Sequence, residues 1–191
     1  MNKSRLEAFS DGVVAIAITI MVLNLKIPRG ANWGELSAIA QPLFSYLLSF
    51  IYVGIYWVNH HHLMQPVHGV NGLILWANLH LLFWLSLIPF VTAWVSVDPS
   101  ASPPVAIYGV VLLMSSFSFL LLGKALLAKE GENSRLALAL GKGRKNQISI
   151  CLYILAISFS LWNGIAGLLV YAIVAILWFL PDRRIENLRW D

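Results

Sequence analysis

The sequence predicts an all-α, polytopic membrane protein with six transmembrane helices, and three observations support this prediction. Of the 191 residues, 59% are hydrophobic and 12% are charged, whereas about 25% of the residues in a soluble domain are charged. Several apolar runs approach the roughly 20 residues that cross the hydrocarbon core of a bilayer. The basic residues lie between these runs, as topology signals do, and are not interleaved with aromatic residues as in nucleic-acid-binding surfaces. The composition therefore excludes a soluble domain and argues against a nucleic-acid partner.

The six predicted helices fill most of the chain. They are Phe9 to Ile27, Ile39 to Trp57, Leu73 to Val95, Val105 to Leu127, Ile148 to Trp162 and Ile165 to Leu180. A helix satisfies its own backbone groups, as a bilayer requires, and the alternation typical of a membrane barrel is absent. We expect residues 1–191 to form a single transmembrane domain with no internal repeat.

Prolines mark several of the predicted helix ends. Pro28, Pro99 and Pro181 follow apolar segments, where a residue without an amide hydrogen stops a helix. Pro42 and Pro89 lie inside the second and third segments, and we expect each to kink its helix.

The basic residues divide unevenly between the two sets of loops. Eleven of the thirteen precede the first span, surround the loop after the fourth or follow the sixth: Lys3, Arg5, Lys124, Lys129, Arg135, Lys142, Arg144, Lys145, Arg183, Arg184 and Arg189. Lys26 and Arg29 belong to the other set. Because loops rich in Lys and Arg stay in the cytoplasm, both termini are expected there.

Polar residues gather at the predicted cytoplasmic ends of the first three spans. They are Arg5, Glu7, Ser10 and Asp11 in the first, Trp57, Asn59, His60, His61 and His62 in the second, and Asn78 and His80 in the third. A charged side chain at the centre of a bilayer costs about 2.5 to 3.5 kcal/mol, so such residues need partners or a function. The cluster predicts either a hydrogen-bonded network between the three spans or a solvated rim at the lipid headgroups.

Neither a metal site nor a catalytic centre is predicted. The three consecutive histidines point roughly 100° apart on a helix, and they lack the i, i+4 spacing of helical zinc sites. Ser10, Asp11 and a histidine suggest a hydrolase, but no G-x-S-x-G turn accompanies them. Cys151 stands in an apolar run and is expected to be a packed thiol.

The first span contains two apolar stripes at helical spacing. One holds Ile16, Ile20, Leu23 and Ile27, and the other holds Val14, Ile18, Met21 and Leu25. Periodicity alone does not show which stripe packs against the rest of the protein. Thr19 lies near the middle of the span, and its hydroxyl is expected to bond back to the carbonyl of Ala15.

The start of the first span carries a recognisable pattern. Residues 5–12, Arg-Leu-Glu-Ala-Phe-Ser-Asp-Gly, resemble the R-x-x-x-F-S-D signature of the transmembrane protein 175 family, the endosomal and lysosomal potassium channels and their bacterial relatives. The likeness continues to Thr19, through Trp57 to His61, and at Asn78 and Leu87 to Phe90. The later spans resemble the family only in hydropathy and spacing. Animal members carry two six-span repeats, so this chain is similar to the bacterial form, in which four identical subunits supply the pore.

The resemblance implies roles for particular residues. Ile16 would form the narrowest hydrophobic ring of a pore lined by the first span, with Ile20 and Leu23 outward of it and Thr19 assisting selectivity. The polar network would comprise Arg5, Phe9, Ser10, Asp11, His61 and Asn78, and His60 could replace His61.

The implied protein is a homotetrameric potassium channel in the inner (plasma) membrane of a bacterium. Its partners would be potassium ions, identical subunits and the lipid bilayer, with no cofactor. The chain has no T-V-G-Y-G filter, so a weak to moderate preference for potassium over sodium would arise at the apolar neck, where potassium sheds water more cheaply. The alternative is a proton-coupled transporter in which Asp11 and a histidine exchange protons.

Overall fold

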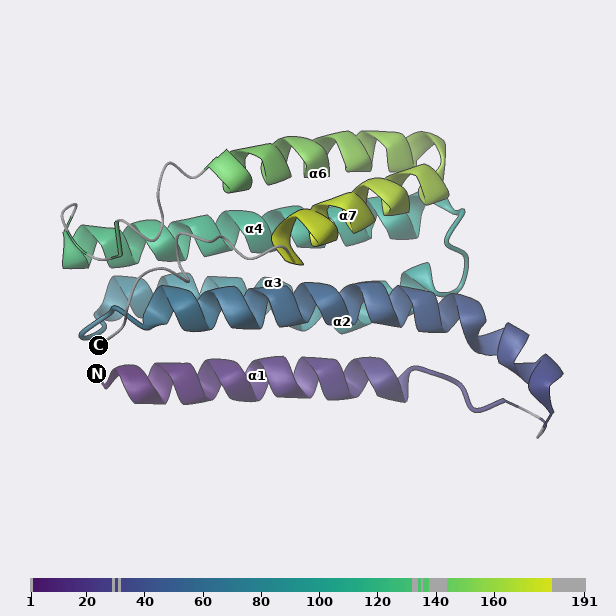
Figure 1. The fold of residues 1–191 in the computed structure, drawn as a ribbon, viewed down its shortest axis with the longest axis horizontal. Helices are drawn as coiled ribbons and strands as arrows, with labels where there is room; N and C mark the ends of the chain where they lie inside the picture. Colours follow the sequence, from purple (N-terminus) through teal and green to yellow (C-terminus); the bar gives the residue numbers. More distant parts are fainter. Residues whose placement is uncertain are drawn as a thin grey trace.

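In a computed structural model, the described residues are 2–28, 30, 32–131, 134, 136–137 and 144–179. They form six α-helices, one 3-10 turn and no strand (Figure 1). These elements are α1 (Lys3–Leu23), η1 (Trp33–Glu35), α2 (Leu36–Met64), α3 (Gly72–Val95), α4 (Ser102–Glu130), α6 (Arg144–Trp162) and α7 (Gly164–Phe179). The described part of the chain is therefore all-α, as predicted.

Each helix corresponds to one predicted apolar segment, but several ends differ. α1 begins at Lys3 because the side chain of Asn2 accepts a hydrogen bond from the Ser4 amide at 3.2 Å and caps the helix. It ends at Leu23 and not at Ile27, because the amides of Asn24 and Leu25 bond to the carbonyls of Met21 and Val22, three residues back, and the α-helical pattern stops there. α2 runs beyond Trp57 to Met64, so the three histidines are helical.

Successive helices run antiparallel (Figure 1). The start of α1, the end of α4 and the start of α6 therefore lie at one end of the bundle, and they carry Lys3, Lys129 and Lys145. Lys26 follows α1 at the opposite end. The remaining basic residues of the topology argument include Arg29, Arg135, Lys142, Arg183, Arg184 and Arg189, which lie outside the described residues.

Four of the described helices are long and apolar enough to cross a membrane. They are α1, residues Ile39–Met64 of α2, α3 and α4. α7 is apolar but shorter, with 16 residues, and α6 begins with four polar residues, Arg144 to Gln147. Length and composition thus support four of the six predicted spans directly.

The α2, α4, α6 and α7 helices pack around buried tyrosines. Tyr52, Tyr108, Tyr153 and Tyr171 are each at most 2% exposed. Tyr52 donates to the backbone oxygen of Tyr171 at 2.6 Å, and the Tyr108 hydroxyl bonds with Ser49 at 3.0 Å. Because a phenol in an apolar interior needs a polar partner, these bonds help to fix how α2 meets α7 and α4.

The structure can be compared with the expectations for Pro42, Pro89 and Cys151. Figure 1 shows that α2 bends near its N-terminal end, the part of the helix that contains Pro42. Pro89 lies inside the continuous helix α3.

The expectation that Cys151 is a packed thiol is wrong, since this thiol is exposed. It lies on the face of α6 that the neighbouring helices leave uncovered, together with Ile148 and Ile154.

Candidate functional site

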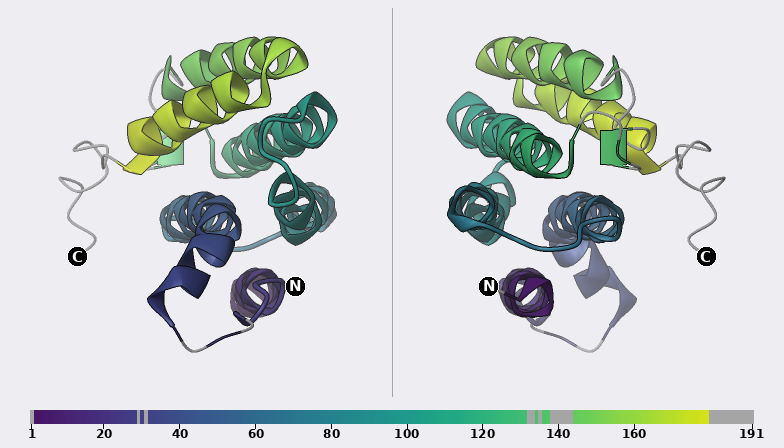
Figure 2. Two further views of the ribbon diagram at one scale, coloured as in Figure 1. Left: turned by 90° about the vertical axis from the view of Figure 1, so that its right-hand side faces the viewer. Right: turned by 90° about the vertical axis from the view of Figure 1, so that its left-hand side faces the viewer.

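α1 has one packed face and one uncovered apolar face. Five residues at helical spacing are buried where α1 meets α2 and α3: Leu6, Ser10, Val14, Ala17 and Met21. Ile16, Ile20 and Leu23 are 61%, 45% and 76% exposed. Figure 2 shows α1 at the edge of the bundle, next to α2 and α3. The structure thus resolves the choice between the two stripes, because Val14 and Met21 pack inward while the Ile16 stripe stays uncovered.

A buried hydrogen-bonded network joins the first three helices. The Asn78 amide donates to Ser10 Oγ at 2.9 Å, and Ser10 Oγ in turn donates to the Leu6 carbonyl at 2.8 Å. His60 Nε2 lies 2.9 Å from Asn78 Oδ1. Because that oxygen can only accept, His60 carries its hydrogen on Nε2. Ser10, His60 and Asn78 are 2%, 7% and 2% exposed, so the network is a core feature and not a solvated rim.

A second contact joins α1 to α2 closer to the surface. Trp57 Nε1 donates to Asp11 Oδ1 at 2.9 Å, and both residues are exposed. Glu7, four residues before Asp11, shares this side of α1, but it pairs with Lys3 at 3.7 Å in the same helix.

The structure does not bring every predicted network residue together. His60 takes the position proposed for His61, which is exposed and lies edge-on against the ring of His62. The reason is helix phase, since Tyr52, Tyr56 and His60 follow one another at four-residue spacing on the buried side of α2. Arg5 and Phe9 are also exposed, and no hydrogen bond or ion pair joins the Arg5 guanidinium to the described residues.

His80 belongs to a separate contact between α3 and α4. Trp84 Nε1 donates to His80 Nε2 at 3.1 Å, so the ring hydrogen sits on Nδ1 and is donated to Ser118 Oγ at 2.9 Å. Ser118 passes its own hydrogen to the Met114 carbonyl at 2.6 Å. The sequence placed His80 in the same polar group as Asn78, but the two side chains serve different helix pairs.

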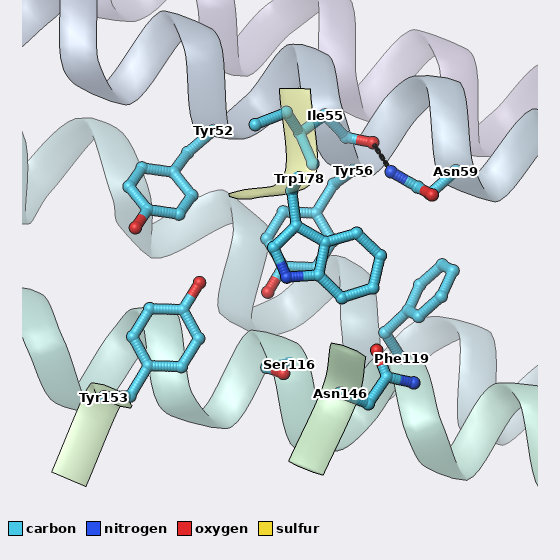
Figure 3. A pocket seen from close by; sticks show the side chains of 9 residues that line it. All are labelled: Tyr52, Ile55, Tyr56, Asn59, Ser116, Phe119, Asn146, Tyr153 and Trp178. Atoms are coloured by element: carbon cyan, nitrogen blue, oxygen red, sulfur yellow. Dashed lines mark hydrogen bonds between the residues drawn. The ribbon is translucent and has the colours of Figure 1, made fainter. Parts of the chain in front are cut away.

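A cavity inside the helix bundle is unsuited to an ion, and Figure 3 shows the side chains that line it. It lies between α2, α4, α6 and α7, and its lining is Tyr52, Ile55, Tyr56, Asn59, Ser116, Phe119, Asn146, Tyr153 and Trp178. Aromatic rings dominate this lining and no residue in it is charged, so it offers few ligands to replace the water around a cation. Among the described residues, no cluster of three or more His, Cys, Asp or Glu side chains could hold a metal.

The candidate site is therefore the uncovered face of α1 together with the network that holds the helix in place. Residues 5–89, which include the three network residues and all of α1 except Lys3 and Ser4, match the family described as endosomal/lysosomal potassium channel TMEM175. A potassium channel of Chryseobacterium sp. (strain P1-3) is 52% identical over 187 residues, which cover 98% of this chain and 97% of that protein. This chain belongs to the TMEM175 family.

Two further TMEM175 proteins show how far the similarity extends. The crystal structure of a lysosomal potassium-selective channel TMEM175 homolog from Chamaesiphon minutus matches with a TM-score of 0.78 and 27% identity, covering 93% of this chain and 96% of that one. The human endosomal/lysosomal proton channel TMEM175 is 37% identical over 79 residues, 35% of this chain and 16% of the human protein. The chain is thus a membrane protein of a family of ion channels, whose relatives are named potassium channels or proton channels, and its fold is that of a bacterial member.

Proposed function

We propose that four copies of this chain form a potassium channel whose pore is lined by α1. The observation that carries the proposal is the uncovered apolar face of α1, in which Ile16, Ile20 and Leu23 lie opposite the packed residues. An apolar face at the edge of a bundle suits either lipid or a pore neck, and the potassium-channel relatives favour the neck. In this arrangement, Ile16 forms the narrowest ring and the other two residues lie outward of it.

The proposed ring accounts for both selectivity and gating. An apolar neck supplies few oxygen ligands, so an ion passes only by giving up part of its water, which costs potassium less than sodium. A slightly narrower neck expels water altogether and stops every ion. The channel is therefore expected to prefer potassium weakly to moderately and to need no bound cofactor.

Thr19 is suited to assist at this neck. Its hydroxyl donates to the Ala15 carbonyl at 2.8 Å, as expected from the sequence, and the side chain is exposed. Because the hydrogen is engaged within the helix, the oxygen lone pairs remain free to accept from water or to contact a cation. Four such oxygens next to the Ile16 ring replace some of the water that the ion loses.

The proposed subunit is a single six-helix transmembrane domain with both termini in the cytoplasm of a bacterium, embedded in the inner (plasma) membrane. This orientation rests on the basic residues at one end of the bundle. A six-span domain requires α6 and α7 to cross the membrane as well. At 1.5 Å per residue, the 19 residues of α6 span roughly 28 Å and the 16 residues of α7 span roughly 24 Å. The partners are potassium ions, three further copies of the chain and the bilayer.

The alternative of a proton-coupled transporter gains no support from the side-chain contacts. Asp11 accepts from Trp57, while His60 bonds with Asn78, so each side chain is paired with a structural partner. The relatives named as potassium channels do not favour this alternative either.

Ion flux from liposomes that contain the purified protein tests the proposed function. We expect flux that rises linearly with potassium concentration, exceeds sodium flux and does not require a proton gradient. Flux that saturates and stops when the proton gradient is collapsed would instead show a transporter.

A further inference from the structure

Arg5 lies on the same face of α1 as Ile16. The two residues are separated by about three helical turns, which return a side chain to nearly the same direction. Arg5, Phe9 and Gly12 are all exposed, as Ile16 is. All of them lie opposite the buried stripe through Ser10. Arg5 and Ile16 therefore face the same surroundings, whether these are a pore, lipid or water.

The charge of Arg5 is free within the described residues, in contrast to that of its neighbour Lys3. Lys3 Nζ donates to the Gln65 carbonyl at 3.1 Å and pairs with Glu7 at 3.7 Å. These contacts hold Lys3 against the end of α2, away from the Ile16 face. No described acceptor or carboxylate takes the Arg5 guanidinium. The first turns of α1 thus carry one basic side chain held by the bundle and one directed to the uncovered face.

We propose that Arg5 forms a ring of four positive charges at the inner mouth of the pore and limits the access of potassium from that side. This inference rests on the proposed function, because it needs four α1 helices around one axis. At 1.5 Å per residue, the ring lies about 16 Å along the helix from the Ile16 neck. A positive ring lowers the local concentration of cations in the mouth and leaves the neck itself unchanged.

The ring acts differently on the two directions of current. A potassium ion moving outward meets the four charges before it reaches the neck, whereas an ion moving inward meets them after it has passed. Outward current is therefore limited more than inward current. The effect depends on ionic strength, because the screening length is about 30 Å at 0.01 M salt and about 3 Å at 1 M.

Currents in planar bilayers test the ring, with symmetric potassium chloride at about 20 mM and at about 1 M. At low salt, Arg5→Gln should raise the ratio of outward to inward current roughly two-fold, and at high salt the ratio should equal that of the wild type. Arg5→Lys keeps the charge and should keep the wild-type ratio. Lys3→Gln is the matched control, because it removes a neighbouring charge from the other side of α1, and it should leave the ratio unchanged.

Chemical modification gives the same test in protein that has already folded. In a Cys151→Ser background, which removes the exposed native thiol, Arg5→Cys is labelled with a positively or a negatively charged thiol reagent. The positive label should lower the ratio of outward to inward current and the negative label should raise it. Equal ratios with both labels, or a Lys3→Gln effect as large as that of Arg5→Gln, would overturn the ring.

The Ile16→Asn variant separates this inference from the proposed function. If Ile16→Asn changes ion selectivity while the Arg5 variants and labels have no effect, the pore stands and the charge ring is wrong. If neither position affects the current, α1 does not line the pore and both proposals fall.

Discussion

Asn78 on α3 donates its side-chain amide to the hydroxyl of Ser10 on α1 at 2.9 Å, and both residues are 2% exposed. The same amide group reaches α2 through His60. One side chain therefore fixes the rotation of α1 about its axis relative to two other helices. That rotation decides which residues of α1 remain uncovered.

The first prediction concerns this network. Asn78→Leu keeps the approximate volume but leaves His60 Nε2 without its acceptor, at a cost of about 1 to 3 kcal/mol for the stranded group. We expect a lower midpoint of thermal unfolding and a lower yield of the proposed tetramer on size-exclusion chromatography. His60→Ala should act in the same direction. His61→Ala is the control and should leave both quantities near wild type, because His61 is exposed. An effect of His61→Ala as large as that of His60→Ala would contradict the assignment.

The choice between His60 and His61 illustrates what the sequence can and cannot specify. A polar cluster linking the first three spans was predictable, since buried polar groups in a bilayer need partners. The phase of α2 was harder to predict, because Tyr56, Trp57, His60 and His61 contain both polar and apolar parts and no clear amphipathic stripe separates them. The i, i+4 series from Tyr52 through Tyr56 to His60 is the signal that could have identified His60.

Helix ends and single-residue burial were also only partly predictable. Hydropathy locates the apolar segments, but polar residues remain helical beyond the membrane core, as they do at the end of α2. The two stripes of α1 are similarly apolar, so their difference in burial arises from tertiary contacts with α2 and α3. For the same reason, hydropathy did not distinguish an exposed Cys151 from a packed one.

The second prediction concerns the packing of α4 against α7. A Cβ at Gly109 would lie 2.6 Å from Cζ of Tyr171 and 2.7 Å from Cγ1 of Ile157, so Gly109→Ala must displace buried side chains. We expect a loss of about 1 to 3 kcal/mol, measured as a lower midpoint of thermal unfolding. Gly54→Ala is the matched control, since a Cβ at Gly54 would meet nothing within 4 Å. A Gly109→Ala protein as stable as Gly54→Ala would show that α4 and α7 do not meet in this way.

The third prediction concerns topology. Reporter domains fused after Gly30 and after Asp191 should report opposite sides of the membrane, with the Asp191 fusion in the cytoplasm, because most basic residues flank that side. The measurement is the activity of a reporter that works only in the cytoplasm, paired with one that works only outside it. Finding both fusion points on one side would mean that the number of crossings is not even or that a span is missing.

The fourth prediction concerns Thr19. Thr19→Val keeps the shape of the side chain but removes the hydroxyl that faces away from the packed side of α1. Conduction should remain measurable, while the preference for potassium over sodium should fall, because fewer oxygens replace the lost water. The reversal potential under opposed potassium and sodium gradients measures this change. Thr19→Ser keeps the hydroxyl and should preserve the preference. An unchanged reversal potential in Thr19→Val would show that the hydroxyl has no role in selectivity beyond its bond to Ala15.

The fifth prediction concerns the neck itself. Ile16 is 61% exposed, whereas Ile18 packs against the core from another face of the same helix. Ile16→Asn should therefore wet the ring, raise the conductance and let sodium through, while Ile18→Asn should mainly reduce the yield of folded protein. The measurements are single-channel conductance and the reversal potential under potassium and sodium gradients, in protein that elutes as a tetramer. Folded Ile16→Asn protein with wild-type conductance and selectivity would show that Ile16 does not line the neck, and the pore would then have to be sought on a different face of the bundle.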